Sequence, residues 1–146
     1  TDLAYYDTVI PEGGALASPN LFAYTLSNTF LGEAAIRFGL TGSSLVLNDS
    51  DPAGFSALRL ALEGLAWGES PLMLAGICDL DPPEGFASDE GAPRGTVFLV
   101  LAGQKPELLP FHAEIVLDGH GTISVNARAV DSWADLVHSC LKTEKK

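Results

Sequence analysis

Cysteine and methionine are scarce in this sequence. Its 146 residues include two cysteines, Cys78 and Cys140, and one methionine, Met73. Two distant cysteines form neither a disulfide framework nor the paired spacing of a zinc site, and free thiols favour a reducing compartment. We therefore expect no bound metal, and no motif indicates a cofactor. Because the chain begins at Thr1, we also expect that a segment precedes it in a longer protein.

Positive charge is scarce as well. Eight lysines and arginines stand against 19 aspartates and glutamates, which gives a formal net charge of −11. A nucleic-acid-binding surface needs cations to neutralise phosphates, so nucleic acid is not an expected partner, and an anionic membrane surface is disfavoured for the same reason. The sequence has no apolar run long enough for a membrane span and no signal-like start, so we expect a cytoplasmic protein.

Apolar content is where the chain is rich. Hydrophobic residues make up 47% of the sequence, and the mean hydropathy is +0.21. These values exclude a disordered chain, because enough apolar surface is present to build a core. A chain of this length can bury such a core within one domain, so we expect residues 1–146 to form a single domain.

The first regular elements are predicted in the first third of the chain. Ser18–Tyr24 reads as an extended lead-in. Asn28–Phe38 carries apolar residues at helical spacing, and Gly39 is suited to end that helix in the left-handed conformation. The short apolar run Ser44–Leu47 then predicts a buried strand.

A helix and a second strand follow. Asp51 fits the N-cap of a helix and Pro52 its first position, where no backbone N–H is missed. Ala53–Trp67 continues with an apolar stripe and ends at Gly68. Pro71–Ile77 is almost continuously apolar, which is typical of a parallel strand that is covered on both faces.

Taken together, these segments resemble the N-terminal half of a β-ketoacyl synthase. Ser27–Gly42 reads SNTFLGEAAIRFGLTG, and Met73–Gly76 reads MLAG. In that family an Asn, a Gly and a similar AIRFGL run precede a strand, an elbow that carries the nucleophilic cysteine, a helix and a strand reading MLAGG. The resemblance covers roughly the middle half of the chain. It implies an α/β fold, namely a thiolase-like half domain in which a mixed β-sheet packs with helices, and a missing first strand-helix segment.

The resemblance aligns the family's elbow with four residues of this chain, Asp49, Ser50, Asp51 and Gly54. Asp51 occupies the position of the nucleophilic cysteine, so we expect this chain to have no catalytic residue. A cysteine at a helix N-terminus is activated as a thiolate, whereas an aspartate there is held ionised as a cap that contributes about 1 kcal/mol. We interpret Asp51 as a structural cap, and the alternative is a carboxylate that acts on substrate.

The remainder of the chain predicts a strand, a hairpin and a helix. Gly95–Ala102 is an apolar strand that resembles the one closing the N-terminal half of a synthase. Phe111–Leu117 and Thr122–Ala127 alternate as a β-hairpin. A last helix begins near Asp131 and has an apolar face. The acidic segment Asp79–Arg94 matches no calcium-loop pattern, so we interpret it as a solvated loop.

Three histidines, His112, His120 and His138, are interpreted as incidental. No cysteine or serine nucleophile pairs with them by motif. The histidines of the resembling family belong to a C-terminal half that has no counterpart in this chain.

The resemblance leads to a ranked set of functions. First is a non-catalytic β-ketoacyl-synthase-like subunit, similar to a chain length factor, which pairs with an active synthase in fatty-acid or polyketide biosynthesis. The alternatives are an acyltransferase of the 3-oxoacyl carrier-protein synthase type that uses unusual chemistry, and a structural, acyl-binding or self-associating module. The resemblance also implies a homodimer or a heterodimer with a synthase, contact with acyl carrier protein, and a dimer seam at Ser44, Leu45, Val46 and Leu47.

Overall fold

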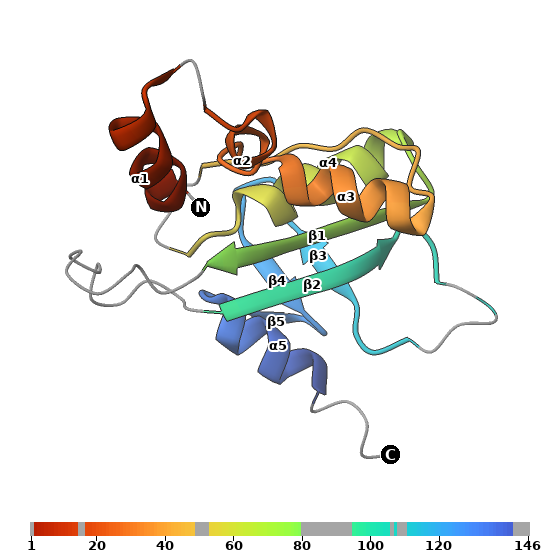
Figure 1. Cartoon of the computed structure of the whole chain (residues 1–146). Helices are drawn as coiled ribbons and strands as arrows, with labels where there is room; N and C mark the ends of the chain where they lie inside the picture. The colour runs from red at the N-terminus through yellow and green to blue at the C-terminus, as the bar shows by residue number, and fades with distance from the viewer. Residues whose placement is uncertain are drawn as a thin grey trace. The chain divides into compact units, whose positions relative to one another are not determined.

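The computed structural model describes residues 2–14, 17–48, 53–79, 95–105, 107 and 111–141. Figure 1 shows its helices and strands. In chain order they are α1 (Asp2–Glu12), α2 (Pro19–Ala23), α3 (Thr29–Phe38), α4 (Ser56–Trp67), β1 (Leu72–Asp79), β2 (Gly95–Ala102), β3 (Ile115–Leu117), β4 (Ile123–Val125), β5 (Arg128–Ala129) and α5 (Trp133–Leu141). The backbone divides into two compact units, Thr1–Val46 and Leu47–Lys146, which we call the N-terminal and C-terminal units. A single domain over 1–146 stays a prediction.

Among the described residues of the N-terminal unit, helices are the only regular secondary structure. Its first pair, α1 and α2, is joined by an aromatic contact in which the ring centroids of Tyr5 and Phe22 lie 5.7 Å apart. The segment Ser18–Tyr24 was expected to be extended, and that prediction is wrong. The hydroxyl of Ser18 accepts a hydrogen bond from the backbone N–H of Leu21, and Pro19 takes the first position of the helix. Ser-Pro is therefore a helix start here.

Helix α3 confirms the prediction for Asn28–Phe38. It ends at Gly39, whose φ of 66° lies in the left-handed region, and the backbone N–H of Leu40 donates to the carbonyl of Ala35 at 2.9 Å. None of its side chains is buried. Ile36, near its end, is 87% exposed. The sequence pattern thus predicts the helix but not how its apolar side chains are placed.

The prediction of a strand at Ser44–Leu47 is wrong. These residues have no regular secondary structure, and Leu45 and Leu47 are exposed. A short strand needs a neighbour to take up its backbone hydrogen bonds. The described strands pair only among themselves, in the order β1-β2 and β3-β4-β5. A dimer seam at this segment stays a prediction.

The centre of the C-terminal unit is the antiparallel pair β1 and β2, covered on one face by α4. The two strands align over their full length, from Leu72 opposite Ala102 to Asp79 opposite Gly95. Their inner face packs on Leu58 and Ala61 of α4. The residues of that face are Met73, Ala75 and Ile77 of β1 and Val97, Leu99 and Leu101 of β2.

The pairing corrects two predictions about the sheet. Pro71–Ile77 was expected to lie in a parallel strand, and the sheet was expected to be mixed. Both sheets among the described strands are antiparallel. An unbroken apolar run is typical of a strand covered on both faces, yet the described residues cover β1 on its inner face only. The fold class that the structure supports is a mixture of helices and small antiparallel sheets.

Helix α4 begins later than the sequence predicted. Phe55 is its N-cap residue and Ser56 its first residue, so the prediction that Ala53–Phe55 belong to the helix is wrong, while Asp51 and Pro52 lie outside the described residues. Gly54, whose φ of 67° lies in the left-handed region, interrupts a helical backbone before Ser56. The ring of Phe55 is almost fully buried and lies 5.7 Å from the ring of Trp133, centroid to centroid.

The predicted hairpin and last helix complete the C-terminal unit, and both are confirmed. In the hairpin turn, a carboxylate oxygen of Asp118 accepts the backbone N–H groups of Thr122 at 2.8 Å and His120 at 2.9 Å. A turn at Asn126 then adds β5 to β4. The core joins these elements to α4 and the β1-β2 pair, and its buried members are Phe55, Leu58, Ala61, Ala75, Leu101, Ile123, Val125, Val130, Trp133 and Leu136.

Candidate functional site

The predicted elbow is only partly described by the structure. Asp49, Ser50 and Asp51 lie outside the described residues. Gly54 is described, and its φ of 67° places it in the left-handed region that favours glycine. Its carbonyl oxygen accepts a hydrogen bond of 2.8 Å from the indole nitrogen of Trp133. The end of the elbow is therefore fixed to the start of α5.

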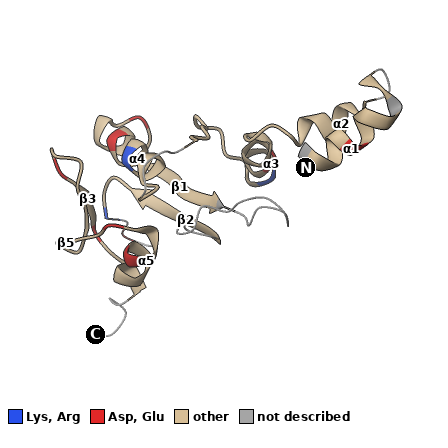
Figure 2. Ribbon diagram, turned by 90° about the vertical axis from the view of Figure 1, so that its left-hand side faces the viewer, with Lys and Arg blue, Asp and Glu red and all other residues tan. Residues whose placement is uncertain are grey.

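Beside this contact lies an apolar groove of about 490 Å³ between the β1-β2 pair and α5. We call it the α5 groove. It is lined on the strand side by Ile77, Gly95 and Val97, and on the helix side by Trp133, Ala134, Val137, His138 and Leu141. Ile77 and Val97 belong to the inner face, so α5 flanks the same face of the pair as α4. In Figures 1 and 2 the two strands lie between α4 above and α5 below. Because Trp133 touches both Gly54 and the groove, the groove adjoins the described end of the elbow.

Among the described residues that line the α5 groove, none has a carboxylate, ammonium or guanidinium group. Described charged side chains of the C-terminal unit lie on α4, on α5 and near the hairpin, as the coloured segments of Figure 2 show. The indole N–H of Trp133 already donates to Gly54. Of the described lining residues, His138 is the other one with a polar side chain. A groove of this character binds apolar groups and can offer one hydrogen bond at its edge.

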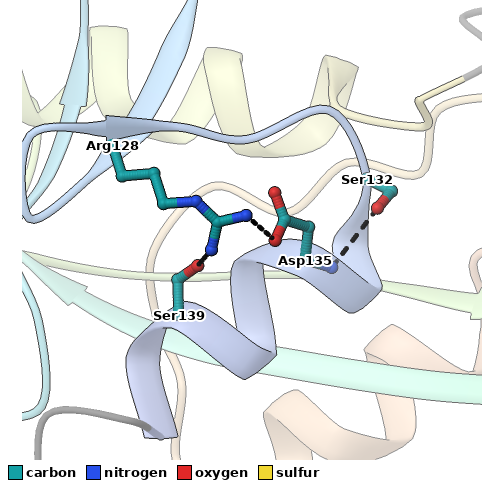
Figure 3. Close-up of polar contacts among 4 residues, drawn as sticks. All are labelled: Arg128, Ser132, Asp135 and Ser139. Carbon is teal, nitrogen blue, oxygen red and sulfur yellow. Dashed lines mark hydrogen bonds and ion pairs between the residues drawn. The ribbon is translucent and has the colours of Figure 1, made fainter.

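A polar cluster holds α5 against β5 (Figure 3). The guanidinium of Arg128 donates to the carboxylate of Asp135 at 2.8 Å and to the hydroxyl of Ser139 at 3.1 Å. The hydroxyl of Ser132 accepts the backbone N–H of Asp135 at 3.3 Å. None of these residues lines the α5 groove. An ion pair this exposed contributes about 0.2–1 kcal/mol, so its main effect is to orient the helix that forms one wall of the groove.

Neither cysteine has the environment of an activated nucleophile. Burial raises the pKa of the Cys140 thiol, which keeps it protonated near neutral pH. Cys78 is exposed at the end of β1, and the hydroxyl of Thr96 donates to its sulfur at 3.4 Å. Across the described ranges, no three metal-ligating side chains cluster together.

The outer face of the β1-β2 pair is a second feature of note. We call it the outer sheet face. Its members alternate with the inward residues, and they are Leu72, Leu74, Gly76 and Cys78 of β1 and Thr96, Phe98, Val100 and Ala102 of β2. Val100 at its centre is 73% exposed. The face is largely apolar and uncharged, and it is exposed along both strands.

A close approach across the strands shapes the outer sheet face. Gly76 pairs with Phe98. A Cβ on Gly76 would lie 2.5 Å from the Phe98 ring and 2.0 Å from the carbonyl oxygen of Val97. Gly76 therefore leaves the space that the aromatic ring occupies, and any larger residue would displace the strand.

The sequence interpretation missed the α5 groove. It grouped Trp133, Leu136, Val137, Cys140 and Leu141 into one apolar face of the last helix. In the structure Leu136 is fully buried, whereas Val137 and Leu141 line the groove. Leu141 is exposed at the end of the helix. His138, interpreted as incidental, also lines the groove.

No family model, curated protein or solved structure matches this chain. Within the ranges that the structure describes, none of the helices has the length and apolar character needed to cross a membrane.

Proposed function

We propose that the chain is a non-catalytic β-ketoacyl-synthase-like subunit that pairs with an active synthase in fatty-acid or polyketide biosynthesis, in the cytoplasm. The residue run from Ser27 to Gly42 and the MLAG of β1 support this proposal, because they resemble that family in order and spacing. Three described elements follow in the order expected from the resemblance. They are a helix after the elbow (α4), the MLAG strand (β1) and a closing strand (β2).

The side chains of the chain support a role without chemistry of its own. Aspartate stands at position 51, where the resemblance places the nucleophilic cysteine. Cys140 is partly buried with a raised pKa, and Cys78 lies on a strand rather than at a helix N-terminus. A cysteine becomes a strong nucleophile in an electropositive, accessible setting, and neither position provides one.

The observation that carries the proposed partnership is the outer sheet face. Exposed contiguous apolar surface of this kind usually marks an interaction site. Among the described strands, β1 and β2 pair only with each other, so each also has an unpaired backbone edge. A two-stranded sheet is marginal by itself and a bare edge invites pairing with another chain. Both features favour a protein partner over isolated function.

Mixing with a purified β-ketoacyl synthase tests the proposal. We expect size-exclusion chromatography with light scattering to show a complex that contains both chains. Val100→Lys places a charge in the centre of the outer sheet face and should abolish the complex. Val116→Lys is the matched control, because Val116 is also an exposed strand valine but lies on β3. Equal complex formation by both variants, or no complex with the unmodified chain, would remove the proposed partnership.

A second candidate function, an acyl-binding module, is favoured by the α5 groove. Its volume falls within the range of about 300–1,000 Å³ that is common for small-molecule sites. The enzymatic alternative, an acyltransferase, makes a separate demand. It requires that incubation with an acyl thioester leaves a covalent acyl group on the chain, which mass spectrometry of the intact protein would detect.

A further inference from the structure

We draw no further inference here: the strongest candidate, the exposed apolar surface of helices α1 and α3 in the N-terminal unit, which includes Tyr6, Ile10, Ile36 and Phe38, carries none because nothing in the structure shows what covers it.

Discussion

Helices α3 and α4 share a sequence pattern but differ in how many of their side chains are buried. Each has apolar residues at helical spacing and ends at a glycine in the left-handed conformation. Helix α4 buries Leu58, Ala61 and Gly64, whereas α3 buries none of its side chains. The same contrast separates the two units, because every member of the buried core belongs to the C-terminal unit. Periodicity thus predicts a helix, while burial decides how much that helix stabilises the fold.

The largest expected effect comes from a direct comparison of those two helices. Leu58 is 0% exposed, and Leu58→Ala should lower the free energy of unfolding by about 2–5 kcal/mol because it removes buried methyl groups and leaves a cavity. Ile36→Ala in α3 should change it by less than about 0.5 kcal/mol, since that side chain is already in solvent. Urea unfolding followed by tryptophan emission and by far-UV circular dichroism measures both. Comparable losses would show that α3 is buried as deeply as α4.

A smaller but still clear effect is expected at Gly76. Gly76→Ala introduces a Cβ 2.0 Å from a backbone oxygen, and a clash with backbone is relieved only by moving the strand, which typically costs about 1–3 kcal/mol. Gly42→Ala is the control in the N-terminal unit, because a Cβ there meets nothing within 4 Å. Denaturant midpoints compare the two. If Gly76→Ala is neutral, the close pairing of Gly76 with Phe98 is not as the structure shows it.

The smallest expected effect is a pH dependence at the hairpin turn. Hydrogen bonds from the backbone N–H groups of Thr122 and His120 hold the pKa of the Asp118 carboxyl below its ordinary value. The folded state therefore gains stability from this group above the unfolded pKa, and the gain is lost as the pH falls through the folded pKa. Asp118→Asn keeps an accepting oxygen but does not titrate.

Unfolding measured from neutral to acidic pH should show the original chain losing stability relative to Asp118→Asn. A difference between the two proteins that stays constant over that range would mean that Asp118 does not cap the turn as an anion.

Local signals predicted most elements of this fold. The left-handed glycine after Phe38, the hairpin and the last helix each follow from residues that lie close together in sequence. Two of the failures depend on distant partners. The direction of β1 is decided by its pairing with β2, and Ser44–Leu47 has no described neighbouring strand. The helix at Pro19–Ala23 instead follows from a local cap, the hydroxyl of Ser18.

The candidate site was harder to predict than the fold. The resemblance pointed to the elbow, of which only Gly54 is described. The α5 groove forms where Ile77 and Val97 face Trp133 and Val137 across a long separation in sequence. No spacing within either segment indicates that the other lies opposite. The apolar face of the last helix was visible in the sequence, but which part of it remains uncovered depends on the packing of the hairpin.

Hydrogen exchange on the full chain, alone and mixed with a β-ketoacyl synthase, tests the central claim most directly. Alone, the amides of α4, β1 and β2 should exchange slowly and those of α1, α2 and α3 quickly, because only the first group belongs to a buried core. With the synthase, protection should rise in β1 and β2, whose edges are unpaired among the described strands. Equal protection of α3 and α4 in the free chain, or no change in β1 and β2 on mixing, would contradict the account.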